Sequence, residues 1–258
     1  MTKEQMELEK GHLASQRLAM KGIREVAKLV GEGFSEKDCA RMLDSWFRDH
    51  GIKSYFHGPF AWIGERCRFS GMKRYRDFLP TDRVLRAGEV FILDVAPIYK
   101  GYQSDVGLTF CLGENEDFEK AMCYLEEVRK NIPKLFSSQN GSEIYAAIEE
   151  DFSKHGYDNI HQLYPFGVLG HKMHRSPEVL GRLKILRFGW QSFYSLLVRG
   201  LVGQILTRGY KGSLEGVWAI EPHIGGVGFG AKFEEFLVVE EGRAFWLEDK
   251  WSKEKNVF

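Results

Sequence analysis

The spacing of apolar residues in the first fifty positions predicts two amphipathic helices. In residues 13–31, apolar side chains recur three and four positions apart, as on one face of a helix: Leu18, Ala19, Ile23, Val26, Ala27 and Val30. Ser35 has the character of an N-cap, and Glu36 follows it in the expected first turn. The second helix then presents one apolar face and is predicted to end at Gly51.

Farther along the chain, helical patterns alternate with strand-like apolar runs. Helices are predicted at about 117–135 and 142–156, and residues 52–75 read as loop with short strands. Strands are predicted twice within 89–111 and at 166–174, 216–224, 231–240 and 243–248. This mixture predicts an α+β domain.

An apolar and basic segment at 183–210 interrupts the strand pattern. Its plainest interpretation is an extra packed helix. The functional alternatives are a lid over a cleft, a dimer contact or a membrane-skimming patch, anchored by Trp190, Phe193 and Tyr194.

The apolar run VFILDVAPIYKGYQSDVGLTF, at 90–110, contains two aspartates. Residues 100–101 fit a two-residue hairpin turn, which places Asp94 opposite Gly107. Because side chains alternate along strands, Asp94 and Asp105 then share one face as diagonal neighbours, with backbones roughly 7–8 Å apart.

Two carboxylates on one buried face repel each other and lose hydration. They call for a shared proton, an arginine or lysine, or a metal ion between them. The alternative is that one aspartate is only a turn residue at the sheet edge.

A second acidic hairpin occurs at 217–240, in VWAIEPHIGGVGFGAKFEEFLVVE. With its turn at 227–228, Glu221 opposes Glu234 on one face. The two hairpins indicate an internal duplication that brings four carboxylates to a pseudo-twofold axis. Oxygen-rich sets of this size suit a pair of divalent ions such as Mn, Fe, Co or Zn.

Two of the eight histidines lie between the hairpins, in FGVLGHKMHRSPEV. His171 and His174 fall within four residues, after a glycine and inside a predicted strand. This placement makes them candidate ligands, with packed or surface histidines as the alternative, whereas His57, His161 and His223 stay undecided.

Composition narrows the class of protein. Lysine plus arginine and aspartate plus glutamate each number 36, so the formal charge is zero, which argues against nucleic-acid binding. The four cysteines form no CxxC pair, and the polar N-terminus lacks the apolar core of a signal peptide. No apolar run reaches membrane-spanning length, so a cytoplasmic protein is expected.

The order of the candidate residues Asp94, Asp105, His171, Glu221 and Glu234 resembles the ligand set of the pita-bread metallopeptidases: methionine aminopeptidase, aminopeptidase P and prolidase. LDVAPIYKGYQSD, GHKMH, WAIEP and AKFEEFLVV resemble that family's motifs in the same order. The resemblance implies a duplicated pita-bread fold of the α+β class. Residues 1–258 would form one such catalytic domain, with an atypical insertion at about 183–210.

The chemistry implied by the resemblance is amide hydrolysis by a metal-bridged hydroxide. The five residues would hold two divalent ions (Mn, Co, Fe or Zn), with Asp105 and Glu234 as bridges. Glu221 would also move a proton to the leaving nitrogen, and His174 would donate to the substrate carbonyl. The implied substrate is a peptide N-terminus or a dipeptide, and a homodimer is possible.

Three departures from the family pattern leave alternatives open. No histidine occurs in 58–93, where the family carries one in a loop, and SDVGLTF lacks the family's arginine. Aligning HRSP instead of GHKMH puts Gly167 at the ligand position, while His174 lines the site in both alignments. The rival hypothesis is a non-peptidase pita-bread protein that binds a peptide or partner, or acts on a small amino-acid derivative.

Overall fold

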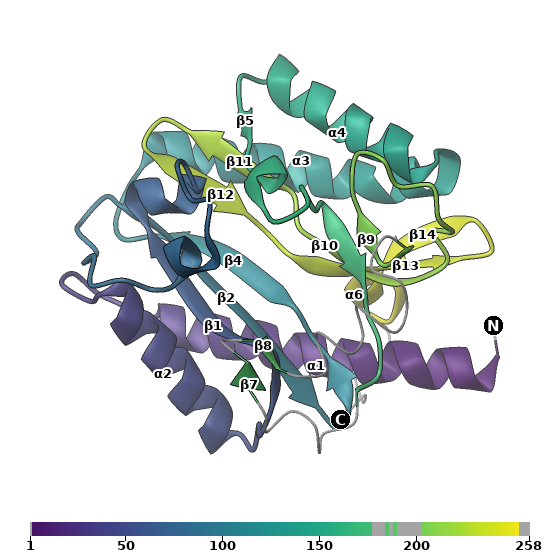
Figure 1. Cartoon of the computed structure of the whole chain (residues 1–258), viewed down its shortest axis with the longest axis horizontal. Coiled ribbons are helices and arrows are strands. Elements are labelled where there is room, and N and C mark those ends of the chain that lie inside the picture. Colours follow the sequence, from purple (N-terminus) through teal and green to yellow (C-terminus); the bar gives the residue numbers. More distant parts are fainter. Residues whose placement is uncertain (1, 177–183, 186–187, 190–202, 253–258) are drawn as a thin grey trace.

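Two pairs of helices flank the strands of the molecule (Figure 1). The computed structural model describes residues 2–176, 184–185, 188–189 and 203–252. The helices are α1 (Lys3–Ala27), α2 (Glu36–Asp49), α3 (Glu116–Ser138), α4 (Gly141–Lys154) and the short α6 (Leu247–Lys250). Among these described helices, none is both long and apolar enough to cross a lipid bilayer.

Helix α2 begins where the sequence predicts. The Ser35 side chain accepts a hydrogen bond from the Asp38 backbone N–H, and the Asp38 side chain accepts one from the Ser35 backbone, which forms a capping box. Cys39, Leu43 and Phe47 form the buried face. By contrast, α1 begins ten residues earlier than predicted. Its first turns are mostly polar, so they lack the apolar spacing on which the prediction rested, and a capping box at Thr2 starts the helix there.

The first group of strands forms a six-stranded sheet in which β4 pairs with β2 beside the path β3-β2-β1-β8-β7. Its strands are β1 (Tyr55–Ile63), β2 (Val90–Tyr99), β3 (Tyr102–Gln103), β4 (Val106–Cys111), β7 (Lys184–Ile185) and β8 (Phe188–Gly189). Strand β1 is nine residues long and buried throughout, so the prediction of loop and short strands at 52–75 is wrong for its first part.

The hairpin that carries the two aspartates has the predicted register. Tyr99 pairs with Tyr102, and Asp94 pairs with Gly107. Lys100 and Gly101 both have positive φ, 51° and 80°, as a mirror-image hairpin turn requires.

The second group of strands forms two sheets. The five-stranded sheet has the order β14 (Arg243–Trp246), β13 (Glu235–Glu240), β10 (Gly216–Ile220), β6 (Gly170–Lys172) and β9 (Ile205–Leu206). The three-stranded sheet has the order β12 (Phe229–Lys232), β11 (His223–Gly226) and β5 (Asp158–Asn159). Each predicted strand of the second hairpin is therefore split in two where the hairpin passes from one sheet to the other.

The register of the second hairpin is also the predicted one. Ile220 pairs with Glu235 on one side, and His223 pairs with Lys232 on the other. The residues between these pairs place Glu221 across from Glu234. The break between β10 and β11 therefore contains Glu221, and the break between β12 and β13 contains Glu234.

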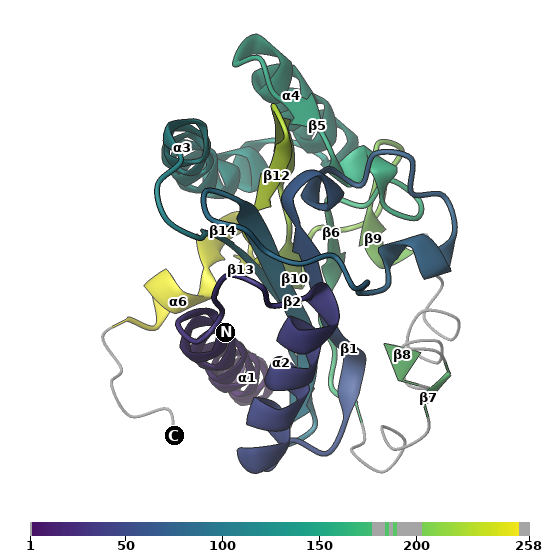
Figure 2. The same ribbon diagram turned by 90° about the vertical axis from the view of Figure 1, so that its left-hand side faces the viewer.

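Each half of the molecule has its own helix pair, and α1 also reaches β13 and α6 of the second half. Helices α1 and α2 pack on β1 and β2, whereas α3 and α4 cover the strands of the second half (Figures 1 and 2). The halves meet where β4 lies beside the end of β12. There Thr109 Oγ1 donates to the Lys232 carbonyl at 2.7 Å and accepts from its N–H at 2.8 Å. This arrangement confirms the predicted α+β class.

Only part of the segment at 183–210 can be compared with its prediction. Its described parts contain three short strands, β7, β8 and β9, instead of the predicted helix, because they pair with each other or with β1 and β6. The proposed anchors Trp190, Phe193 and Tyr194 lie outside the described residues.

A buried histidine in the second half makes stability depend on pH. Neither ring nitrogen of His161 has a hydrogen-bond partner among the described residues, and the ring packs edge-on against Tyr145 and Phe152. Burial lowers the pKa of His161 from 6.5 to about 3. Below pH 6.5 the unfolded chain therefore binds a proton that the folded chain does not, and stability falls as the pH falls toward 3.

Replacing His161 with phenylalanine should remove this penalty. At pH 5 the substitution should raise the free energy of unfolding by about 2 kcal/mol more than at pH 8. The reason is that pH 5 lies about 1.5 units below the pKa of histidine in the unfolded chain, and each unit corresponds to about 1.4 kcal/mol. Urea denaturation of both proteins at the two pH values measures the difference. Equal effects at pH 5 and pH 8 would show that His161 does not titrate on unfolding.

Candidate active site

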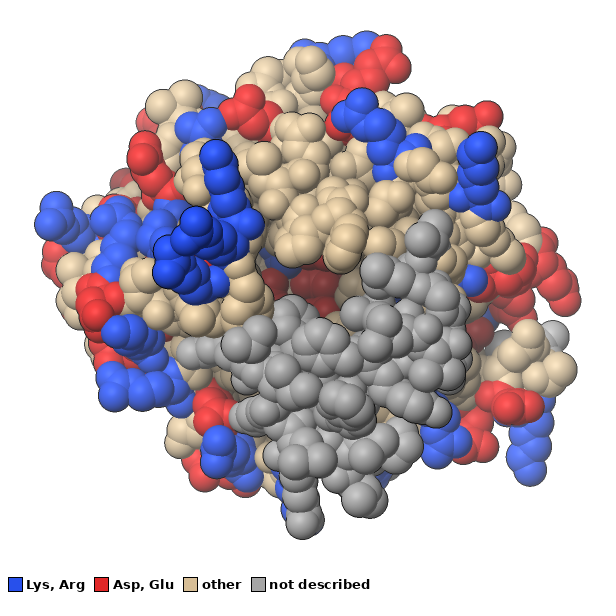
Figure 3. All heavy atoms as spheres, in the orientation of Figure 1, with Lys and Arg blue, Asp and Glu red and all other residues tan. Residues whose placement is uncertain are grey.

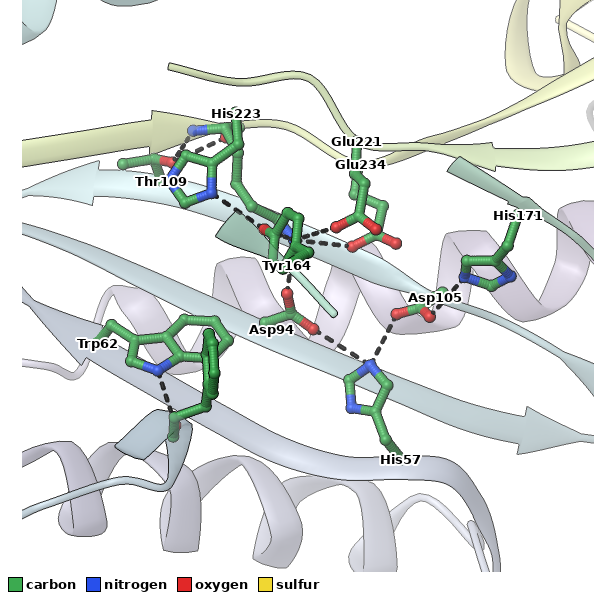
Figure 4. A network of polar contacts seen from close by, with 12 residues as sticks. His57, Trp62, Asp94, Asp105, Thr109, Tyr164, His171, Glu221, His223 and Glu234 are labelled. Atoms are coloured by element: carbon green, nitrogen blue, oxygen red, sulfur yellow. Dashed lines mark hydrogen bonds and ion pairs between the residues drawn. The ribbon is translucent and has the colours of Figure 1, made fainter. Parts of the chain in front are cut away.

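The four carboxylates predicted to meet do converge at the junction of the two halves (Figure 4). Asp94 comes from β2 and Asp105 from the residues just before β4, whereas Glu221 and Glu234 follow β10 and β12. Asp94, Asp105 and Glu234 are 4%, 5% and 1% exposed. Buried carboxylates at this density require compensating positive charge.

The compensating charge that the structure supplies is the ammonium group of Lys232. Its Nζ lies 2.7 Å from Asp94 Oδ2, 3.0 Å from Glu221 Oε2 and 3.1 Å from Glu234 Oε2. The side chain is 1% exposed. Of the three forms of neutralisation that the sequence left open, the lysine alternative is therefore present.

The sequence contained a signal for Lys232. It is the one charged residue in the apolar strand FGAK and stands two positions before Glu234. Alternation along an extended chain places such residues on the same face. The prediction from the sequence contained only the acids of this strand and omitted Lys232.

His57 also enters the site, from β1. Its Nε2 lies 2.8 Å from Asp105 Oδ1 and 3.4 Å from Asp94 Oδ1. Its Nδ1 lies 2.9 Å from the Gly58 carbonyl, which can only accept, so the proton of Nδ1 points there. This pattern, one nitrogen on a backbone carbonyl and the other facing carboxylates, is common for histidines that bind metals.

His171 lies on β6 with Nε2 3.0 Å from Asp105 Oδ2, and its ring stacks on Phe56 with centroids 5.6 Å apart. Gly167 lies instead near Tyr145 and Gln162. The alignment that places His171 at the site is thus the one that the geometry supports. His174 is half-buried beyond the end of β6, where its Nε2 lies 2.6 Å from Gln204 Oε1.

The acid next to Glu234 is held apart from this cluster. Glu235 pairs with Arg129 from α3 through two short contacts of 2.6 and 2.7 Å. Adjacent residues of the strand therefore send one carboxylate into the site and the other to a helix on the opposite face.

The close packing of charged groups shifts the pKa values of Lys232, Glu234 and His57. Burial alone would lower the pKa of Lys232, but Asp94 and Glu234 outweigh burial and raise it well above the usual value. Burial, followed by the charge of Asp105, raises the pKa of Glu234 well above normal. Burial also opposes protonation of His57, yet Asp105 raises the pKa of that imidazole to about 9. Without a metal, the ammonium of Lys232, the imidazolium of His57 and a proton retained by Glu234 together offset the negative charge of the four carboxylates.

The site remains open to small molecules. The side chains of Glu221 and His171 are 12% and 14% exposed, although the other acids are buried more deeply. Figure 3 shows acidic side chains at the bottom of a hollow near the centre of this face. A ligand entering that hollow would meet carboxylates.

Comparison with known proteins agrees with this geometry. The model of the metallopeptidase family M24 matches residues 10–241. The chain belongs to this family. The pita-bread fold predicted from the motifs is thereby confirmed for this M24 chain.

Several relatives of this M24 chain are methionine aminopeptidases. Methionine aminopeptidase 2 of Bacillus subtilis is 23% identical over 155 residues, which cover 59% of this chain and 62% of the relative. The methionine aminopeptidase of Aquifex aeolicus is 28% identical over 188 residues, 70% of this chain and 72% of the relative. The match to methionine aminopeptidase 2 of Bacillus subtilis spans about three-fifths of the length of that relative.

Solved M24 structures share the fold. A prolidase from Thermococcus sibiricus has a TM-score of 0.68 at 21% identity, covering 95% of this chain and 59% of the prolidase. A methionine aminopeptidase from Rickettsia prowazekii has a TM-score of 0.63 at 16% identity, covering 96% and 98% of the two chains.

The donor atoms of the M24 site fit a divalent ion. Two groups of side chains offer donors within 4.8 Å of one another: His57, Asp94 and Asp105, and Asp105, His171 and Glu234. Within the described residues, the buried Oδ1 of Asp94 accepts no hydrogen bond. Imidazole nitrogens and carboxylate oxygens together suit ions such as Mn, Fe, Co or Zn.

Proposed function

We propose that this M24 chain is a metal-dependent hydrolase of amide bonds at peptide N-termini or in dipeptides. The observation that carries the proposal is the position of Asp105. Its two oxygens face different histidines, His57 and His171, within a buried cluster of carboxylates. A charge-rich and enclosed site of this kind is suited to metal-assisted hydrolysis.

Asp105, His171 and Glu234 would hold the ion, with Asp94 and His57 beside them. The expected metals are Mn, Co, Fe or Zn. When bound, a divalent ion polarises a carbonyl and lowers the pKa of a water molecule. The resemblance noted from the sequence implies two such ions, a number that metal analysis tests.

Glu221 is the proposed group for proton transfer. Its carboxylate is the most exposed of the four, and one of its oxygens is fixed by Lys232. Burial raises the pKa of Glu221, which favours uptake of a proton by this carboxylate during the reaction. His174 stays the proposed donor to the substrate carbonyl.

The same fold without peptidase activity is the second candidate. Lys232 neutralises part of the acidic cluster without any metal, and a site stabilised in this way can bind a peptide or a small amino-acid derivative without cleaving it. The relatives that are methionine aminopeptidases and the prolidase-like structures favour the hydrolase.

A panel of short peptides tests the proposed function. The protein, supplied with Mn²⁺, should release the first residue from some Met-Xaa or Xaa-Pro peptides, or cleave Xaa-Pro dipeptides, with mass spectrometry of the products as the readout. Peptides acetylated at the N-terminus should resist. Binding without cleavage of any member would favour the second candidate, and cleavage only at internal bonds would contradict both.

A further inference from the structure

We propose that Lys232 is a built-in cation that takes the place of one of the two metal ions expected at this site, so that the chain binds a single divalent ion. This inference rests on the proposed metal dependence. Its strongest support is that the ammonium lies within 3.1 Å of three of the four carboxylates expected to hold metal: Asp94, Glu221 and Glu234.

The backbone fixes the lysine at this place. Strand β12 ends at Lys232, and both its N–H and its carbonyl are held by the Thr109 hydroxyl of β4. The two halves of the molecule are therefore clamped at this residue. Its side chain begins directly beside the junction at which the four acids meet.

A glycine leaves the space that the lysine needs. Gly107 pairs with Asp94 across the hairpin, on the strand that faces Lys232. A Cβ on Gly107 would collide with Lys232 Cε and lie 2.8 Å from Asp94 Oδ2. The aliphatic stem of the lysine thus passes over a position that has no side chain, which indicates a site shaped around it.

The position of the ammonium changes the role of Glu221. One oxygen of Glu221 is occupied by Lys232, and Glu221 belongs to neither group of donors close enough to share an ion. Both of those groups depend on Asp105. An ion in either group would lie beside the ammonium, whose repulsion opposes a second divalent ion. We therefore expect one ion, bound through Asp105.

Metal stoichiometry tests the inference without reference to activity. After equilibrium dialysis against excess Mn²⁺, the wild-type chain should contain one ion per chain by elemental analysis, and the Lys232→Ala variant should contain two. Lys172→Ala is the matched control, because this lysine of β6 lies over the Trp218 ring instead of in the site. The control should bind one ion.

The outcomes separate this inference from the proposed function. Two ions in the wild-type chain, or one in a folded Lys232→Ala variant, would overturn the inference and leave metal-dependent hydrolysis in place. One ion in the wild type without cleavage of any peptide would leave the inference standing and overturn the function. No ion in the wild type would overturn both.

A second measurement covers the case in which Lys232→Ala does not fold without metal. Anomalous scattering from wild-type crystals grown with Mn²⁺ should show one peak, next to Asp105, and no peak among Asp94, Glu221 and Glu234 at the position of the ammonium. A peak at that position would overturn the inference.

Discussion

Replacing Asp105 with alanine should abolish both metal retention and peptide hydrolysis. Asp105 is the one residue common to both donor groups, and its two oxygens contact His57 at 2.8 Å and His171 at 3.0 Å. Without it neither group keeps three donors. The specificity constant kcat/KM should fall by roughly 10³-fold or more, because the ion supplies most of the stabilisation of charge in the transition state.

The control for this variant is a carboxylate of the same kind outside the site. Asp117 lies on α3 with its side chain 71% exposed, so Asp117→Ala should retain both metal and activity. Thermal unfolding would show that both variants are folded. Wild-type metal affinity in a folded Asp105→Ala variant would contradict the assignment of the site.

Replacing Glu221 with glutamine should have a different result: a large loss of turnover with little loss of metal. Glutamine keeps the size of the side chain and can still accept a hydrogen bond from Lys232, but it cannot carry a proton between water and the leaving nitrogen. General acid–base catalysis contributes about 10²–10⁴-fold, so kcat should fall by roughly that factor. Metal content should stay near that of the wild type, because Glu221 lies outside both donor groups.

Measuring kcat, KM and bound metal on the same samples separates the two roles considered for Glu221. Loss of metal together with activity would make it a ligand, as the resemblance to pita-bread peptidases implied. Unchanged kcat would exclude it as the proton carrier. Glu126→Gln, at an exposed position on α3, is the matched control and should change neither quantity.

Local rules were sufficient to predict the acidic cluster. The turn at Lys100 and Gly101 sets the register that places Asp94 opposite Gly107, and the turn at 227–228 places Glu221 opposite Glu234. In hairpins, register follows from the turn and the side-chain period. Helix α2 could be predicted for the same reason, since its cap and its apolar face are both local.

The remaining parts of the site depend on contacts between distant segments. His57 reaches Asp105 because β1 lies beside β2 in the sheet, and no short-range pattern in YFHGPF specifies that neighbour. Lys232 was accessible to the alternation rule, but its partner Asp94 comes from the other half of the chain. Strand β9, two residues long, is positioned by its pairing with β6 and by the burial of Leu206 in the core, neither of which a local pattern specifies.

The most direct test of the central claim follows turnover as metal is withdrawn and returned. The protein is dialysed against a chelator, Mn²⁺ is added back in steps, and bound metal and peptide cleavage are measured on each sample. Metal-dependent hydrolysis at the Asp105 site predicts that cleavage disappears with the metal and returns in proportion to the ion bound. Cleavage that persists in the metal-free protein, or a fully loaded protein that cleaves none of the peptides, would contradict it.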